Sequence, residues 1–150
     1  MKRYWPLATL AVCQLASASP HYDVLIRGGT VYDGSLADGR NANVGIVADR
    51  IVTTDAAADA SADRIIGAGG LLVMPGFIDP HTHATKTLQD PQRNANLNDL
   101  TPGVTTVFIG SDGYGVTQGA ELLSLFESQG IGTNVATLVG HGRVRREVMG

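Results

Sequence analysis

An apolar run that ends in two closely spaced histidines constrains this chain more than any other feature. Residues 71–78 are almost all apolar, and residues 79–83 read Asp-Pro-His-Thr-His. Such a run is typical of a strand buried on both faces of a parallel sheet. Because alternate side chains of a strand point to one face, His81 and His83 would project together, with Asp79 on the same side. The pattern predicts a site for a divalent metal ion; the alternative is a chance His-Thr-His sequence in a surface loop.

A second buried strand is predicted directly before a turn that contains an aspartate. A short helix around residues 95–100 ends at Thr-Pro-Gly, and residues 104–109 are β-branched or aromatic. Gly-Ser-Asp-Gly follows at residues 110–113. Functional side chains gather at the carboxyl ends of parallel barrel strands, which makes Asp112 a third candidate metal ligand. The alternative role is a turn aspartate that accepts hydrogen bonds from its own backbone.

The next strand–helix unit predicts two candidate substrate-binding residues. An amphipathic helix is expected over residues 117–129, capped by Thr117 and ended by Gly130. Its apolar stripe would consist of Leu122, Leu123, Leu125 and Phe126. A third strand is expected over 133–139. Gly-His-Gly follows that strand, so His141 would lie at the strand end. Arg145 carries the guanidinium fork that suits a substrate carboxylate. A structural histidine and a solvated arginine are the alternatives. Lys86, in the polar segment after the histidines, is expected to be a solvated loop residue.

Residues 19–70 are expected to have a structural role only. Turn residues separate five short strand-like segments in this region. They are 22–27, 30–32, 43–47, 50–52 and 64–66. Short strands with frequent turns predict the N-terminal part of a small β-sandwich domain.

The first 18 residues predict a secretory signal peptide. Lys2 and Arg3 supply a positive start, residues 5–16 are mostly apolar, and Ala-Ser-Ala ends the segment at Ala18. The apolar stretch is shorter than the about 20 residues that span a membrane, so we expect an exported protein, periplasmic or secreted, whose mature chain has no membrane span. The alternative is an apolar helix retained in a cytosolic protein. Cys13, the single cysteine, would be removed with the signal.

Several segments together resemble a known enzyme family. They are the Pro-Gly-Phe-Ile-Asp-Pro-His-Thr-His sequence at 75–83 and the sequences at 102–110, 134–141 and 145–150. From Tyr22 to its last residue, the chain resembles the N-acyl-D-amino-acid deacylases (D-aminoacylases) of the metal-dependent amidohydrolase superfamily. The resemblance implies an α/β fold in which residues 71–150 form the first three βα units of a (β/α)₈ barrel. Such a barrel needs roughly 250 residues, so we expect barrel and sandwich to be incomplete in an N-terminal fragment of a longer enzyme.

The resemblance also implies a reaction. A Zn²⁺ site with one or two ions, or Mn²⁺ instead, would support hydrolysis of a linear amide, with small-molecule N-acyl-D-amino acids as substrates. The catalytic carboxylate and further histidine ligands are expected beyond Gly150, so no catalytic residue can be named in this chain. These deacylases carry a ligand cysteine where this chain has Asp112. Carboxylate oxygen is still an ordinary zinc ligand.

Two other functions stay open at this point. One is a cyclic-amide hydrolase similar to dihydroorotases and hydantoinases, which share the His-x-His element. The other is a barrel without metal that serves as a binding or scaffold protein. The formal charge of −3 and the lack of a basic patch argue against a nucleic-acid partner.

Overall fold

The computed structural model describes residues 19–150, which form two compact units. The first unit ends at Met74 and the second runs from Pro75 to Gly150, so the division falls four residues after the expected one. The expected signal peptide and Cys13 lie outside the described residues. Among the described helices, none has the length and apolar character needed to cross a membrane.

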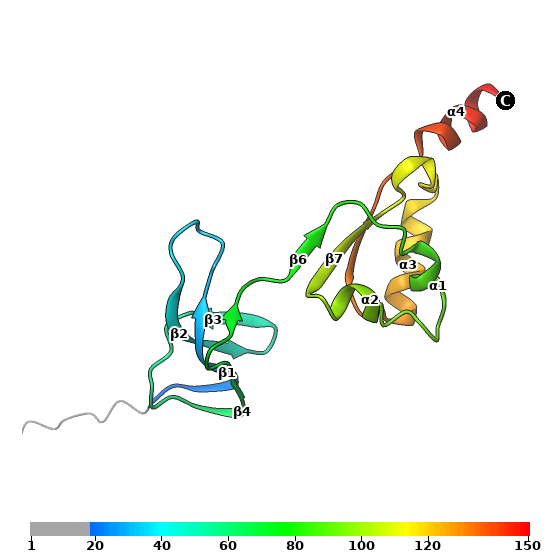
Figure 1. The fold of residues 1–150 in the computed structure, drawn as a ribbon. Coiled ribbons are helices and arrows are strands. Elements are labelled where there is room, and N and C mark those ends of the chain that lie inside the picture. The colour runs from blue at the N-terminus through cyan, green and yellow to red at the C-terminus, as the bar shows by residue number, and fades with distance from the viewer. Residues whose placement is uncertain (1–18) are drawn as a thin grey trace, which may run out of the picture. The chain divides into compact units, whose positions relative to one another are not determined.

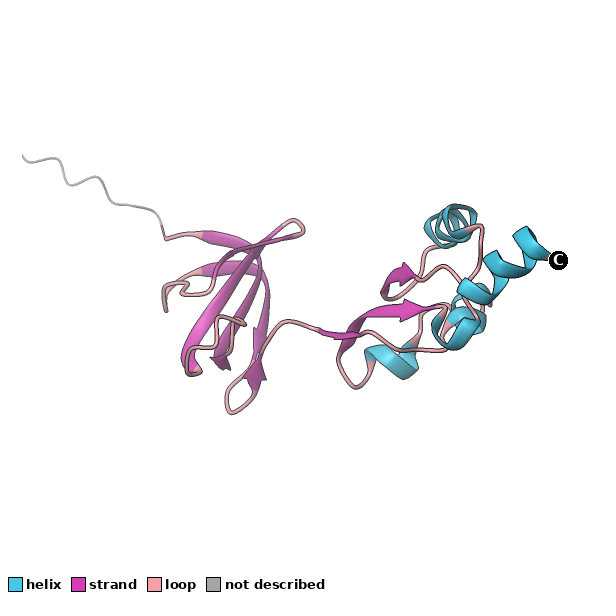
Figure 2. Ribbon diagram, turned by 90° about the horizontal axis from the view of Figure 1, so that it is seen from above, coloured by secondary structure: helices cyan, strands magenta, loops and turns pink. Residues whose placement is uncertain are grey.

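The first unit is built on a five-stranded sheet (Figures 1 and 2). Its strands are β1 (His21–Val31), β2 (Arg40–Val47), β3 (Arg50–Thr53), β4 (Ser61–Gly67) and β5 (Leu72–Val73). Strand β1 pairs antiparallel with β2 and parallel with β4 and β5, and β3 pairs antiparallel with β2. Where two strands were predicted, β1 is continuous, because the glycines at 28–29 produce a shift in register rather than a turn. Leu25 is fully buried at the centre of this unit.

The second unit alternates parallel strands and helices, as predicted for an α/β chain. Its sheet has the order β6 (Phe77–Asp79), β7 (Val104–Ile109), β8 (Asn134–Thr137). The helices are α1 (Thr85–Gln89), α2 (Leu97–Leu100), α3 (Gly119–Gln129) and α4 (His141–Met149), and a 3₁₀ turn, η1, covers Ser111–Gly113. Helix α2 lies within the segment predicted to be helical, but α1 occupies residues where a loop was expected.

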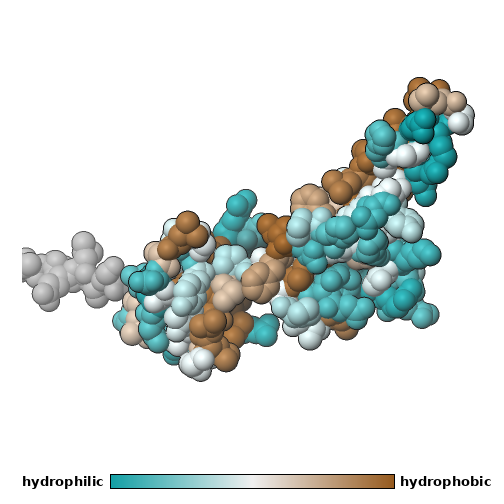
Figure 3. All heavy atoms as spheres, turned by 45° about the horizontal axis from the view of Figure 1, so that its top comes forward, coloured by the Kyte–Doolittle hydropathy of each residue, from teal (hydrophilic) through white to brown (hydrophobic). Residues whose placement is uncertain are grey.

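The expectation of one buried strand over residues 71–78 is wrong. Pro75 and Gly76 interrupt the run, so that β5 joins the sheet of the first unit and β6 joins the sheet of the second. Phe77 and Ile78 are 55% and 64% exposed, and among the described strands β6 pairs with β7 alone. Apolar atoms, brown in Figure 3, are visible on the surface of both units.

A small apolar core holds the second unit together. Leu88 of α1, Val107 and Ile109 of β7, and Leu122 and Phe126 of α3 are almost fully buried and in contact. Leu122 and Phe126 are four residues apart and therefore share one face of α3. Of the predicted apolar stripe, the other two leucines, at 123 and 125, are partly exposed. The core fixes α1 and α3 against β7, and thereby fixes the segments that follow β6 and β7.

Helix α3 ends where predicted but begins two residues later than predicted. The helix begins at Gly119, and Thr117 does not cap it, because the Thr117 hydroxyl donates to the Glu147 carboxylate instead (2.8 Å). Gly130, with a φ of +68°, ends the helix as predicted. The Thr117–Glu147 hydrogen bond ties the segment before α3 to α4.

Candidate metal site and adjoining pocket

The histidine pair is positioned by the residue between its members. Strand β6 ends at Asp79, so His81 and His83 lie in the segment between β6 and α1, not within the strand as expected. Thr82 is buried, and both its backbone N–H (3.0 Å) and its hydroxyl (2.8 Å) donate to the carbonyl oxygen of Phe108. With Thr82 anchored to β7, the flanking histidine side chains both lie exposed at the end of the sheet.

Asp79 supports this segment through its backbone. Its Oδ1 accepts a hydrogen bond from the backbone N–H of His81 (2.9 Å), a local turn that aspartate commonly forms. Sequence alternation had placed Asp79 on the same side as the two rings. In the structure its carboxylate instead accepts a hydrogen bond from the backbone of the segment that carries the rings.

Asp112 reaches the histidines from the turn after β7. Its backbone is left-handed (φ 56°, ψ 31°), a conformation in which aspartate is enriched among residues other than glycine. Its Oδ2 lies 3.0 Å from Nε2 of His81 and 3.4 Å from Nε2 of His83. Among the described residues, the Asp112 carboxylate accepts no backbone hydrogen bond, so its contacts are those of a site residue and not of a turn cap.

The three side chains form a cluster that could hold a metal ion. Each offers one ligand atom, and these atoms lie within 4.8 Å of one another. The side chains are between 55% and 60% exposed, and the two imidazole rings are 5.7 Å apart. Imidazole nitrogen and carboxylate oxygen are ordinary zinc ligands, and catalytic zinc sites combine three protein ligands with an open position. The residues present therefore fit such an ion.

Close backbone contact holds the turn that carries Asp112. A β-carbon on Gly115 would lie 2.5 Å from the carbonyl oxygen of Leu138 and 2.8 Å from Cα of Gly140. A β-carbon on Gly110 would lie 2.7 Å from the same carbonyl oxygen. Real β-carbons do not approach backbone atoms this closely, so only glycine allows the turn after β7 to pack against the segment after β8. Sequence analysis missed this contact, although the frequent glycines at 110–115 and 140–142 were its signal.

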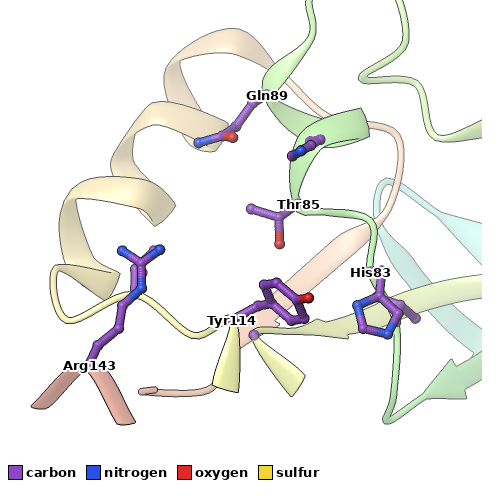
Figure 4. A pocket seen from close by; sticks show the side chains of 9 residues that line it. His83, Thr85, Gln89, Tyr114 and Arg143 are labelled. Atoms are coloured by element: carbon purple, nitrogen blue, oxygen red, sulfur yellow. The ribbon is translucent and has the colours of Figure 1, made fainter. Parts of the chain in front are cut away.

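A pocket of about 540 Å³ adjoins the cluster (Figure 4). Its lining residues come from four segments of the second unit. They are Thr82, His83, Thr85, Lys86, Gln89, Gly110, Tyr114, Val116 and Arg143. The rings of His83 and Tyr114 meet edge to face, 5.9 Å apart. His83 thus belongs both to the metal cluster and to the pocket wall.

The two predicted substrate-binding residues lie elsewhere. His141 is the first residue of α4 instead of the end of a strand, because β8 ends at Thr137. His141 and Arg145 are both exposed, and neither lines the pocket. The arginine that does line it is Arg143, which Figure 4 shows across Tyr114 from His83. Sequence alone could not select among the three arginines of residues 143–146, because the choice depends on the orientation of α4.

The sequence of the chain is similar to those of two deacylases. No protein-family model matches the chain. D-aminoacylase of Alcaligenes xylosoxydans xylosoxydans is 33% identical over an alignment that covers 89% of this chain and 32% of that protein. N-acyl-D-glutamate deacylase of the same organism is 34% identical over 149 residues, covering 85% of this chain and 30% of that protein.

Solved structures of a D-aminoacylase and an N-acyl-D-glutamate deacylase also match the chain. A crystal structure of D-aminoacylase, described as defining a subset of amidohydrolases, matches with a TM-score of 0.73 and 30% identity, over 85% of this chain and 31% of that one. N-acyl-D-glutamate deacylase from Bordetella bronchiseptica, complexed with zinc and a phosphonate inhibitor, matches with a TM-score of 0.68 and 28% identity, over 83% and 31% of the two chains. L-hydantoinase from Arthrobacter aurescens, at 18% identity and a TM-score of 0.61, shares the fold alone. The chain is therefore a homologue of the D-aminoacylases and N-acyl-D-glutamate deacylases among the amidohydrolases, and it spans about a third of the length of these relatives.

Proposed function

We propose that the full-length protein is a metal-dependent amidohydrolase that removes the acyl group from N-acyl-D-amino acids. The observation that carries the proposal is the convergence of His81, His83 and Asp112 in a chain homologous to deacylases of this kind. The related proteins are a D-aminoacylase and an N-acyl-D-glutamate deacylase, which supports the preference for D-amino acids and for a linear amide.

The three side chains would hold Zn²⁺, and Mn²⁺ is compatible with the same nitrogen and oxygen donors. A divalent cation bound there supplies Lewis-acid polarisation of an amide carbonyl and acidifies a water molecule. One of the related D-aminoacylases has a binuclear metal centre, so one or two ions are proposed here. The described residues position the three candidate ligands. Thr82 and Asp79 hold the segment that carries the histidines by hydrogen bonds, and the left-handed turn places the Asp112 carboxylate beside both imidazoles.

Asp112 provides the sharpest test of the metal site, because Asn keeps its shape while removing its charge. In the full-length protein, Asp112→Asn should lower zinc content and the hydrolysis of an N-acetyl-D-amino acid together, with added zinc restoring part of the rate. Asp112→Cys should retain more of both, since thiolate is also a zinc ligand. Asp38→Asn, at an exposed position of the first unit, is the matched control and should change neither. Full zinc content and activity in Asp112→Asn would remove this residue from the site.

The histidines are tested as a pair. Replacing both His81 and His83 by alanine should abolish metal binding and hydrolysis, because two of the three cluster ligands are lost. Their side chains are more than half exposed, so the fold should be retained, as checked by circular dichroism. Unchanged metal content in the double variant would overturn the proposal.

We further propose that the second unit begins a (β/α)₈ barrel and that the first unit is part of a β-sandwich domain. The parallel strands β6, β7 and β8 alternating with helices support the former, and the antiparallel pairing around β2 supports the latter. A crystal structure of the full-length protein tests both.

Export of the protein is also a proposal, which rests on residues 1–18 alone. Sequencing of the N-terminus of the protein recovered from the periplasm or the medium should show cleavage after Ala18. Recovery of the protein only from the cytosol, with Met1 or Lys2 at its N-terminus, would contradict export.

A further inference from the structure

The two histidines of the metal cluster are held in different ways. Nε2 of His81 lies 3.0 Å from the Asp112 carboxylate and forms a hydrogen bond with it. Nε2 of His83 lies 3.4 Å from the same oxygen, beyond the upper limit of about 3.2 Å that is usual for such a bond. Within residues 19–150, the His83 ring takes part in no hydrogen bond. The orientation of His83 therefore depends on contacts of another kind.

A tyrosine ring provides such a contact. The rings of His83 and Tyr114 meet with their centroids 5.9 Å apart and their planes at 85°. Aromatic pairs prefer this edge-to-face arrangement, because the positive edge of one ring lies against the negative face of the other. The His81 ring also contacts His83 (5.7 Å, 67°), but His81 is itself a candidate ligand. Of the two neighbouring rings, only that of Tyr114 belongs to a residue outside the metal cluster (Figure 4).

The backbone at Tyr114 is fixed, although its side chain is largely exposed. The Tyr114 N–H donates to the carbonyl oxygen of Ser111 (3.1 Å). The next residue, Gly115, packs against the backbone of Gly140 so closely that no β-carbon would fit. The same turn carries Asp112 two residues earlier. One turn after β7 thus places a carboxylate beside both imidazoles and an aromatic ring against one of them.

A ring that is held in the binding orientation before the metal arrives binds it more tightly, because less freedom is lost on binding. In metal sites this orientation commonly comes from a hydrogen bond to the second imidazole nitrogen. We infer that Tyr114 is a positioning residue for the metal site: its ring holds the His83 imidazole in the orientation that binds the cation. The inference rests on the metal site of the proposed function and extends it to a residue that is not one of the three candidate ligands.

Two substitutions of Tyr114 in the full-length protein separate the ring from its hydroxyl. Tyr114→Leu removes the ring and should weaken zinc binding by about 3- to 10-fold, the effect of losing one aromatic pair. Tyr114→Phe keeps the ring and should bind zinc as tightly as wild type. Competition with a chelator of known affinity measures both values. Equal losses in the two variants would overturn the inference, because the hydroxyl and not the ring would then be responsible.

Crystal structures of the metal-free proteins measure the orientation itself. His83 should adopt a single ring orientation in wild type and in Tyr114→Phe, and more than one in Tyr114→Leu. Tyr32→Leu, which removes a partly exposed tyrosine from the first unit, is the matched control and should change neither zinc affinity nor the His83 ring. Wild-type zinc affinity in Tyr114→Leu, or an unchanged His83 ring in that variant, would overturn the inference.

Neither measurement depends on turnover, so the inference and the proposed function can fail separately. If wild type binds zinc and Tyr114→Leu weakens that binding, but wild type hydrolyses no N-acyl-D-amino acid, the deacylase proposal fails while the role of Tyr114 stands. If wild type hydrolyses such a compound and Tyr114→Leu binds zinc normally, the role of Tyr114 fails while the deacylase proposal stands. Absence of zinc binding to wild type would overturn the inference.

Discussion

Substitution of Gly115 by alanine tests the backbone contact that positions Asp112. The added methyl would lie 2.5 Å from the Leu138 carbonyl oxygen and 2.8 Å from Cα of Gly140. Both are backbone atoms, so no side-chain rotation relieves the clash, and the turn that carries Asp112 must move. Forced overpacking of this kind costs about 1 to 3 kcal/mol. Gly142→Ala adds the same methyl where no atom lies within 4 Å, and it should leave stability unchanged or raise it by about 0.5 to 1 kcal/mol.

Hydrogen exchange of the full-length protein, read on peptides from β7 and β8, measures this cost locally. Because 1.4 kcal/mol corresponds to a factor of ten, Gly115→Ala should accelerate exchange there by about 5- to 150-fold. Zinc affinity should fall in the same variant, since the displaced turn takes Asp112 away from the histidines. Wild-type exchange and wild-type zinc affinity in Gly115→Ala would refute the argument that the glycine contact holds the site.

Three further changes test the core and the segments around the site. Leu88→Ala should lower the free energy of unfolding by about 2 to 5 kcal/mol in denaturant titration, because Leu88 is fully buried in the core of the second unit. Thr82→Val should cost only about 0.5 to 1.5 kcal/mol, since the β7 carbonyl loses the hydroxyl donor but keeps the backbone N–H donor; a loss as large as that of Leu88→Ala would contradict this. Hydrogen bonds from the Gln92 backbone N–H and from the Arg93 side chain hold the pKa of Asp90 below its ordinary value. Local order after α1 should therefore persist above that value and be lost as the pH falls through the lower, folded one, which NMR titration of the Asp90 carboxyl checks; a normal pKa would refute it.

Local patterns in the sequence were sufficient to predict the elements that depend mainly on the residue types within them. Strand β7 coincides with the predicted residues 104–109, since its β-branched side chains fit a central strand with a partner on each side. The end of α3 at Gly130 follows from the positive φ that glycine permits. The candidate ligands His81, His83 and Asp112 could be named because side chains that follow parallel strands meet at one edge of the sheet.

Tertiary structure decided where the apolar run of residues 71–78 divides and which arginine of α4 lines the pocket. Hydrophobicity indicates that a segment is buried or paired, but it does not say with which sheet, and β5 and β6 pair with different ones. Arg143 and Arg145 have the same side chain, so the sequence gives no reason to choose between them. The packing of α4, through the Gly115–Gly140 contact and the Glu147 hydrogen bond, determines that Arg143 lines the pocket. The sequence by itself thus determined the types of ligand and their order along the chain. Contacts between residues distant in sequence determined which side chains share a site, because such contacts depend on the packing of several elements at once.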